Sequence, residues 1–414
     1  HHNDNNFISS IFELYLVITK TINPLFKIQL DKMNRVYFDN AATTPIRDEV
    51  AQVIFDVMKN NFGNPSSSHS YGRSSKVLVE QSRKSIANYL NVSAGEIVFT
   101  AGGTEADNLV LKSVVKDLGV THIITSKVEH HAVLHTVEAL QRDYKIHVSY
   151  LDLNSDGDVD MNHLETLLQK EEKSLVSLMH VNNEIGNILD IEKVASLCKA
   201  YKALFHTDAV QSVGHYTLDL QDIQIDFLAA SAHKFHGPKG VGFAFVRKNS
   251  GLKPLIIGGE QERGLRAGTE SLHNIVGMEM ALNMAYKNLN EEVAYVSALK
   301  HYFIEKISTE IPGVSFNGRS IDFKKSTYTM VNINLPILPE KAGMLLFQLD
   351  LKGIACSKGS ACQSGSSQNS HVLTEILDEE ELRNPALRFS FSIYNSKEEV
   401  DYVIGVLKTF ISGF

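Results

Sequence analysis

Apolar residues in the middle of the chain form two alternating kinds of run. Short apolar runs of strand length are separated by longer stretches in which apolar residues recur every three or four positions, as on one face of a helix. Two of these helical stretches are Thr104–Leu118 and Ile191–Lys202. The seven strand-like runs are Glu96–Thr100, His122–Ser126, His147–Leu151, Leu175–His180, Leu204–Thr207, Asp226–Ala230 and Val241–Val246. The alternation predicts a mostly parallel, seven-stranded sheet with helices on both faces, in which ligands bind at the carboxyl ends of the strands.

The pattern changes after Thr269. A long helical pattern covers Glu270–Leu289 and Glu291–Ile307, and a smaller region of strands and helices follows from Val314 to the end. A chain of 414 residues is long enough for more than one hydrophobic core. We therefore expect an α/β protein with a large domain over residues 33–289 and a smaller α+β domain over residues 290–414.

Composition excludes some classes of partner. With 43% hydrophobic and 21% charged residues, the chain has the balance of a globular protein in water. Its formal charge of -8 and its pI near 6.1 argue against nucleic acid or an anionic membrane as the main partner, because both repel a net negative surface.

Residues 1–32 stand apart from the rest of the pattern. His1 and His2 have the form of a tag remnant, and Met33 is a plausible natural start. The apolar run Ile11–Ile18 is far shorter than the roughly 20 residues that a membrane span needs, and it contains Glu13. We expect an added or mis-started segment, with a partner-docking or anchoring helix as the alternative.

Three cysteines, Cys198, Cys356 and Cys362, are too few for a disulfide framework in a chain of this size. A reducing compartment, the cytoplasm, is therefore expected. Cys198 falls on the apolar face of a predicted helix, which favours a small core residue over a reactive one.

Two residues at strand ends point to a specific chemistry. Asp208 ends one apolar strand-like run, and Lys234 follows the end of the next. An amine that can join an aldehyde, beside a carboxylate that keeps a pyridine nitrogen protonated, is the pair that pyridoxal phosphate requires. Either residue alone is weak evidence, because single lysines are mostly solvated and an Asp after a strand is often a turn former.

Further motifs occur in a fixed order along the chain. With the Asp208 and Lys234 motifs, they resemble those of the cysteine desulfurases of the NifS and IscS type, which are class V aminotransferases of fold type I. The resemblance implies the pyridoxal phosphate-dependent transferase fold, with residues 33–46 joining the small domain. The motifs are Tyr37–Pro45, Gly63–Ser67, Thr100–Asn108, Val128–His130, His180–Gly186, Phe205–Gln211, Ser231–Gly240, Arg266–Thr269 and Gly359–Cys362.

The sequence also suggests where the cofactor's phosphate binds. Gly102, Gly103 and Thr104 precede an apolar helical run, and backbone N–H groups at a helix N-terminus attract a phosphate. The same triplet alone is more often a simple turn and cap. The resemblance implies that the phosphate is bound at Gly103 and Thr104, by Ser231 and His233, and by Thr269 of the partner subunit in a homodimer.

Other residues take roles only through the resemblance. His130 would stack on the pyridine ring and pass protons, Gln211 would bond the phenolic oxygen, and Asn183 would lie beside that oxygen and the substrate. Without this context each is an ordinary polar loop residue. Arg388 lies in an alternating strand pattern and could point to solvent, whereas the resemblance makes it the clamp for the substrate's carboxylate, which suits a planar guanidinium.

Residues 353–371 are rich in Gly and Ser and lack an apolar period, which predicts a mobile loop. Cys362 in this loop would be exposed, and an exposed thiol is a liability unless it reacts. By resemblance Cys362 attacks the substrate's sulfur and becomes a persulfide. Cys356 is interpreted as a structural thiol, with a redox pair with Cys362 as a hypothesis. No metal site is expected, since Cys356, Cys362 and His371 fall short of the four ligands of structural zinc.

The resemblance implies a pyridoxal phosphate-dependent desulfurase that converts L-cysteine to L-alanine and passes the sulfur to an acceptor protein for iron-sulfur cluster or other thio-cofactor synthesis. A selenocysteine lyase, another class V aminotransferase and a non-catalytic assembly scaffold are the alternatives. The loop length and Gly237–Gly240 favour the long-loop desulfurases, although Phe391–Asn395 is more similar to the short-loop group.

Overall fold

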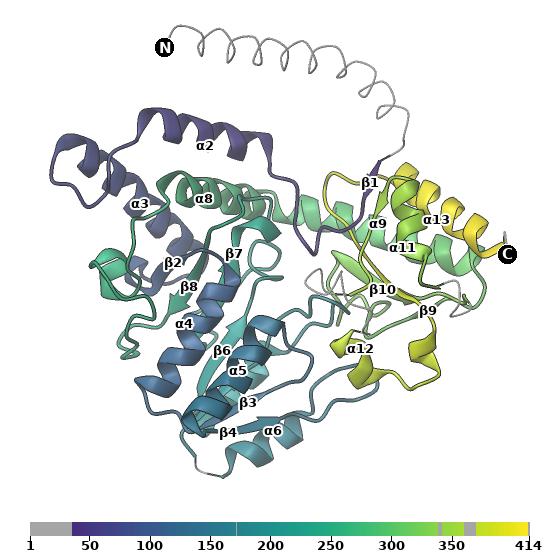
Figure 1. The fold of residues 1–414 in the computed structure, drawn as a ribbon, viewed down its shortest axis with the longest axis horizontal. Helices are drawn as coiled ribbons and strands as arrows, with labels where there is room; N and C mark the ends of the chain where they lie inside the picture. Colours follow the sequence, from purple (N-terminus) through teal and green to yellow (C-terminus); the bar gives the residue numbers. More distant parts are fainter. Residues whose placement is uncertain (1–34, 171, 338–341, 360–369, 413–414) are drawn as a thin grey trace, which may run out of the picture.

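The computed structural model describes residues 35–170, 172–337, 342–359 and 370–412. Its ribbon has a larger part built on a wide sheet and a smaller part that holds the C-terminal helix (Figure 1). Within the described residues, no helix is both long and apolar enough to cross a membrane.

Seven strands of the described residues form the large sheet, in the order β2-β8-β7-β6-β5-β3-β4. The neighbouring pairs from β7 to β4 are parallel, whereas β8 runs antiparallel to both β2 and β7. The predicted mostly parallel sheet is therefore confirmed. Its strands are β2 (Ile97–Thr100), β3 (His122–Thr125), β4 (His147–Tyr150), β5 (Ser174–Ser177), β6 (Leu204–Asp208), β7 (Phe227–Ser231) and β8 (Gly242–Val246).

Helices cover both faces of this sheet because alternate residues of its strands are apolar on opposite sides. Ile124 and Leu228 belong to a core shared with α2, α3 and α6 to α8, whereas the adjacent Ile123 and Phe227 belong to a core shared with α4 and α5. The helices are α2 (Asp48–Asn60), α3 (Ser70–Tyr89), α4 (Gly103–Lys116), α5 (His131–Tyr144), α6 (Met161–Leu168), α7 (Ile191–Ala200) and α8 (Leu272–Lys287).

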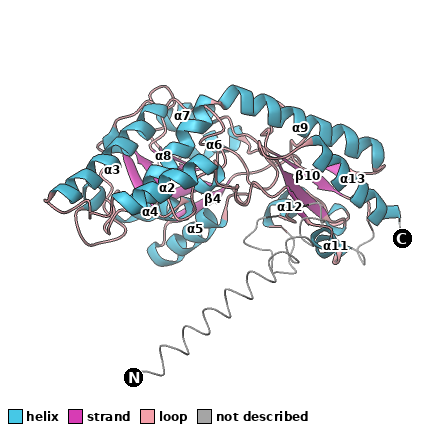
Figure 2. Cartoon of the chain, turned by 90° about the horizontal axis from the view of Figure 1, so that it is seen from above, coloured by secondary structure: helices cyan, strands magenta, loops and turns pink. Residues whose placement is uncertain are grey.

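A separate apolar core lies around a small antiparallel sheet of order β12-β10-β9. Val36 and Phe38 join this core from the other end of the chain, because β1 (Val36–Tyr37) pairs with β11 (Ile354–Ala355). Helices α9 and α13 lie together along this part of the molecule (Figure 2). The remaining elements are α9 (Leu289–Glu310), β9 (Ser315–Phe316), β10 (Met330–Asn334), α11 (Leu345–Leu351), α12 (His371–Ile376), β12 (Ala386–Ser390) and α13 (Lys397–Ser412).

The change of core falls between α8 and α9. Leu282 of α8 packs in the large core, and Val296 of α9 packs in the small one. The domain boundary near residue 290 stays a prediction, which this change of packing partner supports.

Candidate active site

A cavity of about 210 Å³ lies at the carboxyl ends of the strands of the large sheet. Asp208 is the last residue of β6, and Lys234 follows β7 in a short 3-10 turn. Because β6 and β7 are adjacent and parallel, their carboxyl ends bring both side chains to one place. The residues that line the cavity are Ala41, Ala42, Gly103, Thr104, Asp107, His130, Met179, Asn183, Asp208, Val210, Gln211, Ser231, His233, Lys234 and Arg388.

The amine of Lys234 is held at the cavity wall by the N-terminal segment. Its Nζ donates to the carbonyl oxygens of Ala41 at 2.6 Å and Ala42 at 2.8 Å. Gln211 donates from Nε2 to the same Ala41 oxygen at 2.9 Å. The Tyr37–Pro45 motif therefore supplies backbone acceptors for two of the predicted site residues.

One end of the cavity has the form of an anion site. Helix α4 begins at Gly103, and Gly102 before it has φ +150°, a conformation that L side chains rarely adopt. A Cβ at Gly103 would lie 2.5 Å from Val210 Cγ2, so a larger residue there would force Val210 to shift. The first N–H groups of α4 and the hydroxyls of Thr104 and Ser231 are thus available to a phosphate.

The carboxyl of Asp208 is buried among other acids. Its Oδ1 accepts from Val210 N at 2.9 Å. Burial, together with the nearby Asp107, raises the pKa of Asp208 to about 7. Burial likewise raises the pKa of Asp107 to about 8 and raises that of Glu129 well above its usual range. A cation beside Asp208 would favour its charged form.

His130 caps helix α5 and keeps a neutral ring. Its Nδ1 accepts from Ala132 N at 3.1 Å, which leaves the ring hydrogen on Nε2. Burial, the charge of Lys234 and neighbouring histidines lower the pKa of His130 to about 4. Burial, assisted by Lys234 and Lys239, also lowers the pKa of His233 to about 4. Both rings can therefore serve as neutral hydrogen-bond donors.

Arg388 is buried, with 1% of its surface exposed, which excludes the solvent-facing alternative. It donates from one terminal nitrogen to Asn183 O at 2.6 Å and from the other to Asp39 Oδ1 at 2.9 Å. Ser357 Oγ also donates to Asp39 Oδ1, at 2.7 Å. The Nε of Arg388 is buried and has no hydrogen-bond partner in the described residues.

Two predicted residues are not brought to this cavity by the described part of the chain. Thr269 is exposed and does not line the cavity. Cys362 lies outside the described residues. Cys356 is half-buried against the small core, and burial with the charge of Asp39 raises the pKa of its thiol to about 12, as suits a structural role. Cys198 is buried on α7, so its prediction as a core residue is confirmed.

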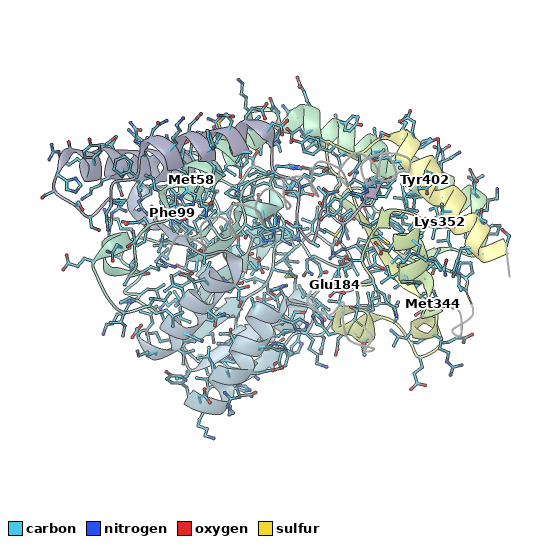
Figure 3. The ribbon with its side chains drawn as sticks, turned by 45° about the horizontal axis from the view of Figure 1, so that its top comes forward. Met58, Phe99, Glu184, Met344, Lys352 and Tyr402 are labelled. Carbon is cyan, nitrogen blue, oxygen red and sulfur yellow. The ribbon has the colours of Figure 1, made fainter. Side chains whose placement is uncertain are left out.

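Four acidic residues near the site were not singled out from the sequence: Asp39, Asp107, Glu129 and Glu184. Each lies within a motif of the resemblance, which was the available signal. Glu184 is 0% exposed and accepts from Ser370 Oγ through Oε2, and its Oε1 lies 3.9 Å from His371 Nδ1. Glu184 lies between the large-sheet part and the small-core part of the molecule (Figure 3).

The residues present fit pyridoxal phosphate. One cavity is lined by an anion cradle at α4, the amine of Lys234 and the buried carboxyl of Asp208. Val210 packs directly against Gly103 at the cradle. A larger cavity of about 430 Å³ shares Met179 with this one, but neither Lys234 nor Asp208 lines it. We therefore place the site by its chemistry and not by cavity size.

Comparisons with known proteins agree with this geometry. The chain is 41% identical to a cysteine desulfurase IscS of Dictyoglomus turgidum over 91% of this chain and 94% of that one. A NifS-like protein of known structure has a TM-score of 0.84 and 34% identity, covering 92% of this chain and 100% of its own. The structure titled SspA in complex with cysteine has a TM-score of 0.74 and 34% identity, covering 87% of this chain and 100% of its own.

The predicted resemblance is therefore confirmed. The model of the family described as aminotransferase class-V matches residues 36–403, and the chain belongs to that family, in its cysteine desulfurase group.

Proposed function

We propose that this chain is a pyridoxal phosphate-dependent desulfurase that converts L-cysteine to L-alanine. The observation that carries the proposal is the joint lining of one cavity by an amine, a buried carboxyl and a buried guanidinium, those of Lys234, Asp208 and Arg388. Similarity to desulfurases along most of the chain, and to a structure titled as a complex with cysteine, supports it. In the overall reaction, cysteine and an enzyme thiol give alanine and an enzyme persulfide.

Pyridoxal phosphate would supply an aldehyde for the Lys234 amine and a ring that withdraws electrons from the substrate's alpha carbon. In this proposal the ionised Asp208 keeps the ring nitrogen protonated. Arg388 binds the substrate's carboxylate, and Asn183 is fixed beside it by the bond from Arg388 to its carbonyl oxygen. The Nζ of Lys234 would take up the alpha proton, and His130, which carries its ring hydrogen on Nε2, would lie against the ring.

The sulfur acceptor on the enzyme is Cys362 in this proposal. Its thiolate attacks the sulfur of the bound substrate, the carbon-sulfur bond breaks, and a persulfide remains on Cys362 while the carbon product takes up protons and leaves as alanine. The persulfide then passes to an acceptor protein for iron-sulfur cluster or other thio-cofactor synthesis. The low cysteine count supports a reducing compartment, the cytoplasm, for this chemistry.

We also propose a homodimer in which Thr269 completes the partner's phosphate site. Thr269 is exposed, as a residue that serves the other subunit must be before association. Its segment lies against a loop with apolar side chains, since Gln261 Nε2 donates to Ser66 Oγ at 3.4 Å, and Phe62 nearby is 72% exposed and stacks on Tyr71. Exposed apolar residues of this kind are typical of protein contacts.

The test uses two variants of the purified holoenzyme. Cys362→Ala should keep the visible colour of the bound cofactor but lose alanine formation from cysteine and the persulfide detected by mass spectrometry. Lys234→Ala should lose both the colour of the lysine-linked cofactor and the activity. The proposal is falsified if Cys362→Ala retains full alanine formation under reductant, or if consumption of a keto acid accompanies turnover.

A further inference from the structure

Three metal-ligating side chains meet at the edge of the large sheet that lies opposite the Lys234 cavity. His122 is the first residue of β3, His147 is the first residue of β4, and Glu172 lies just before β5. The strands are adjacent and parallel, and His122 is in register with both His147 and Ser174. The sheet register therefore fixes the backbone of both histidines and places the start of β5 beside them.

The ligand atoms of this cluster already lie near one another. One ligand atom from each of the three residues lies within 4.8 Å of the other two. Nδ1 of His122 is 3.8 Å from Glu172 Oε2, and Nδ1 of His147 is 3.7 Å from Glu172 Oε1. These distances are too long for hydrogen bonds. They are close to the roughly 3.3 Å that separates two ligands on one tetrahedral zinc ion with bonds of about 2 Å.

Serine hydroxyls lie at both ring nitrogens of His122. Its Nε2 lies 2.9 Å from Ser149 Oγ, whereas its Nδ1 lies 3.3 Å from Ser174 Oγ, which has the Glu172 carbonyl as a nearer acceptor at 3.1 Å. A ring hydrogen on Nε2 would be accepted by Ser149 Oγ and would leave the Nδ1 lone pair toward Glu172.

The rest of the cluster can adjust to an ion. The rings of His122 and His147 are stacked with centroids 4.4 Å apart, so the lone pairs do not yet converge on one point. The side chains of His147 and Glu172 are 50% and 34% exposed, and rotation of these two groups can close the site against the fixed His122 ring. Solvent would supply the fourth ligand.

We propose that His122, His147 and Glu172 bind a divalent transition metal ion of the zinc class, outside the catalytic site. Two imidazoles and one carboxylate form a ligand set that zinc takes. Nickel and copper suit the same imidazoles. The ion would join the amino ends of β3 and β4 to the start of β5 and so stabilise the sheet, with no part in the chemistry at Lys234.

The test measures zinc binding to the full-length holoenzyme by equilibrium dialysis, with metal counted by mass spectrometry. His147→Gln and Glu172→Gln should each bind one zinc ion fewer than the wild-type protein, and zinc should no longer raise their melting temperature. His163→Gln is the matched control, because His163 also pairs with a carboxylate near the surface, Asp152 at 2.9 Å. This control should keep the wild-type stoichiometry.

The proposal is decided by the zinc affinity of one further variant and by the zinc stoichiometry of the ligand variants. Ser149→Ala should bind zinc about tenfold more weakly than the wild-type protein, as is usual when a residue behind a metal ligand is lost. The proposal is wrong if the wild-type protein and both ligand variants bind the same number of ions. Alanine formation should be unchanged in every variant, so this outcome is independent of the desulfurase test.

Discussion

The pKa of Asp208 depends on the acids around it as well as on its own burial. Two further buried acids, Asp107 and Glu129, interact electrostatically with Asp208, and both have a raised pKa. Asp107 also lies 3.4 Å from His206, whose pKa burial lowers to about 4. In a dry pocket these acids do not ionise independently, because each negative charge disfavours the next.

Asp107→Asn should make Asp208 ionise at a lower pH. Asp107 is one cause of the raised pKa of Asp208, so its removal should lower the pH below which the apoprotein loses affinity for pyridoxal phosphate. Equilibrium dialysis of the cofactor between pH 5 and 8 measures this. Asp226→Asn is the control, because Asp226 is also an acid whose pKa is raised by burial but does not line the cavity. Superimposable curves for Asp107→Asn and wild type would refute the argument.

Glu184 contacts the start of helix α12 and also lies near Gly359. Its Oε2 accepts from Ser370, the N-cap of α12, and lies 3.1 Å from where a Cβ on Gly359 would be. Gly359 and Ser370 are the described residues on either side of the stretch that carries Cys362. Glu184 also follows Asn183, whose carbonyl binds Arg388. Glu184 thus links Asn183, beside Arg388, to Ser370 at the start of α12.

Ser370→Ala and Glu184→Gln should slow sulfur transfer by about tenfold or more, because a small displacement of a reacting group is costly in rate. Single-turnover persulfide formation on Cys362 measures this, while cofactor content should stay at the wild-type level. Asp160→Ala is the matched control, since Asp160 caps α6 with two backbone bonds, as Ser370 caps α12. Equal rates in Ser370→Ala and Asp160→Ala would show that only cap stability is lost.

Helix α9 carries a lysine that is 0% exposed. Lys300 Nζ donates to Ser326 Oγ at 2.8 Å and to Thr327 O at 2.7 Å, and burial lowers its pKa to about 7. A lowered pKa means that the folded state holds fewer protons than the unfolded state between about pH 7 and 10.5, so Lys300 stabilises the fold more as pH rises through that range.

Lys300→Met should therefore change the pH dependence of stability. The free energy of unfolding of wild type relative to the variant should rise by about 2 kcal/mol between pH 7.5 and 9.5. Urea denaturation at fixed protein concentration measures both proteins. A difference that does not vary with pH would mean that Lys300 keeps its charge in the folded state.

One surface of the molecule carries exposed apolar side chains around Phe62, beside the segment that contains Thr269. If this face joins two copies, Phe62→Glu should give monomers by sedimentation and weaken cofactor binding, because the partner's Thr269 is lost from the phosphate site. Tyr144→Glu is the control, since Tyr144 is also exposed, at the end of α5. A Phe62→Glu dimer with normal cofactor affinity would contradict this arrangement.

The strand pattern and the ends of the strands could be predicted from local sequence. Apolar runs define β6 and β7, and parallel neighbouring strands place their carboxyl ends together. The sequence alone could therefore predict that Asp208 and Lys234 lie close to each other. The glycines before α4 and the helix that follows them were equally local signals. Short-range periodicity and the geometry of parallel strands are sufficient for such features.

Contacts between distant residues needed the tertiary structure. Asp39 reaches Arg388 across 349 positions, and Asp107 approaches Asp208 only because α4 packs against the sheet. The same holds for Glu184 with Ser370, and for His122 with Glu172. Such contacts depend on how distant elements pack together. The local pattern of apolar and polar residues does not specify that packing.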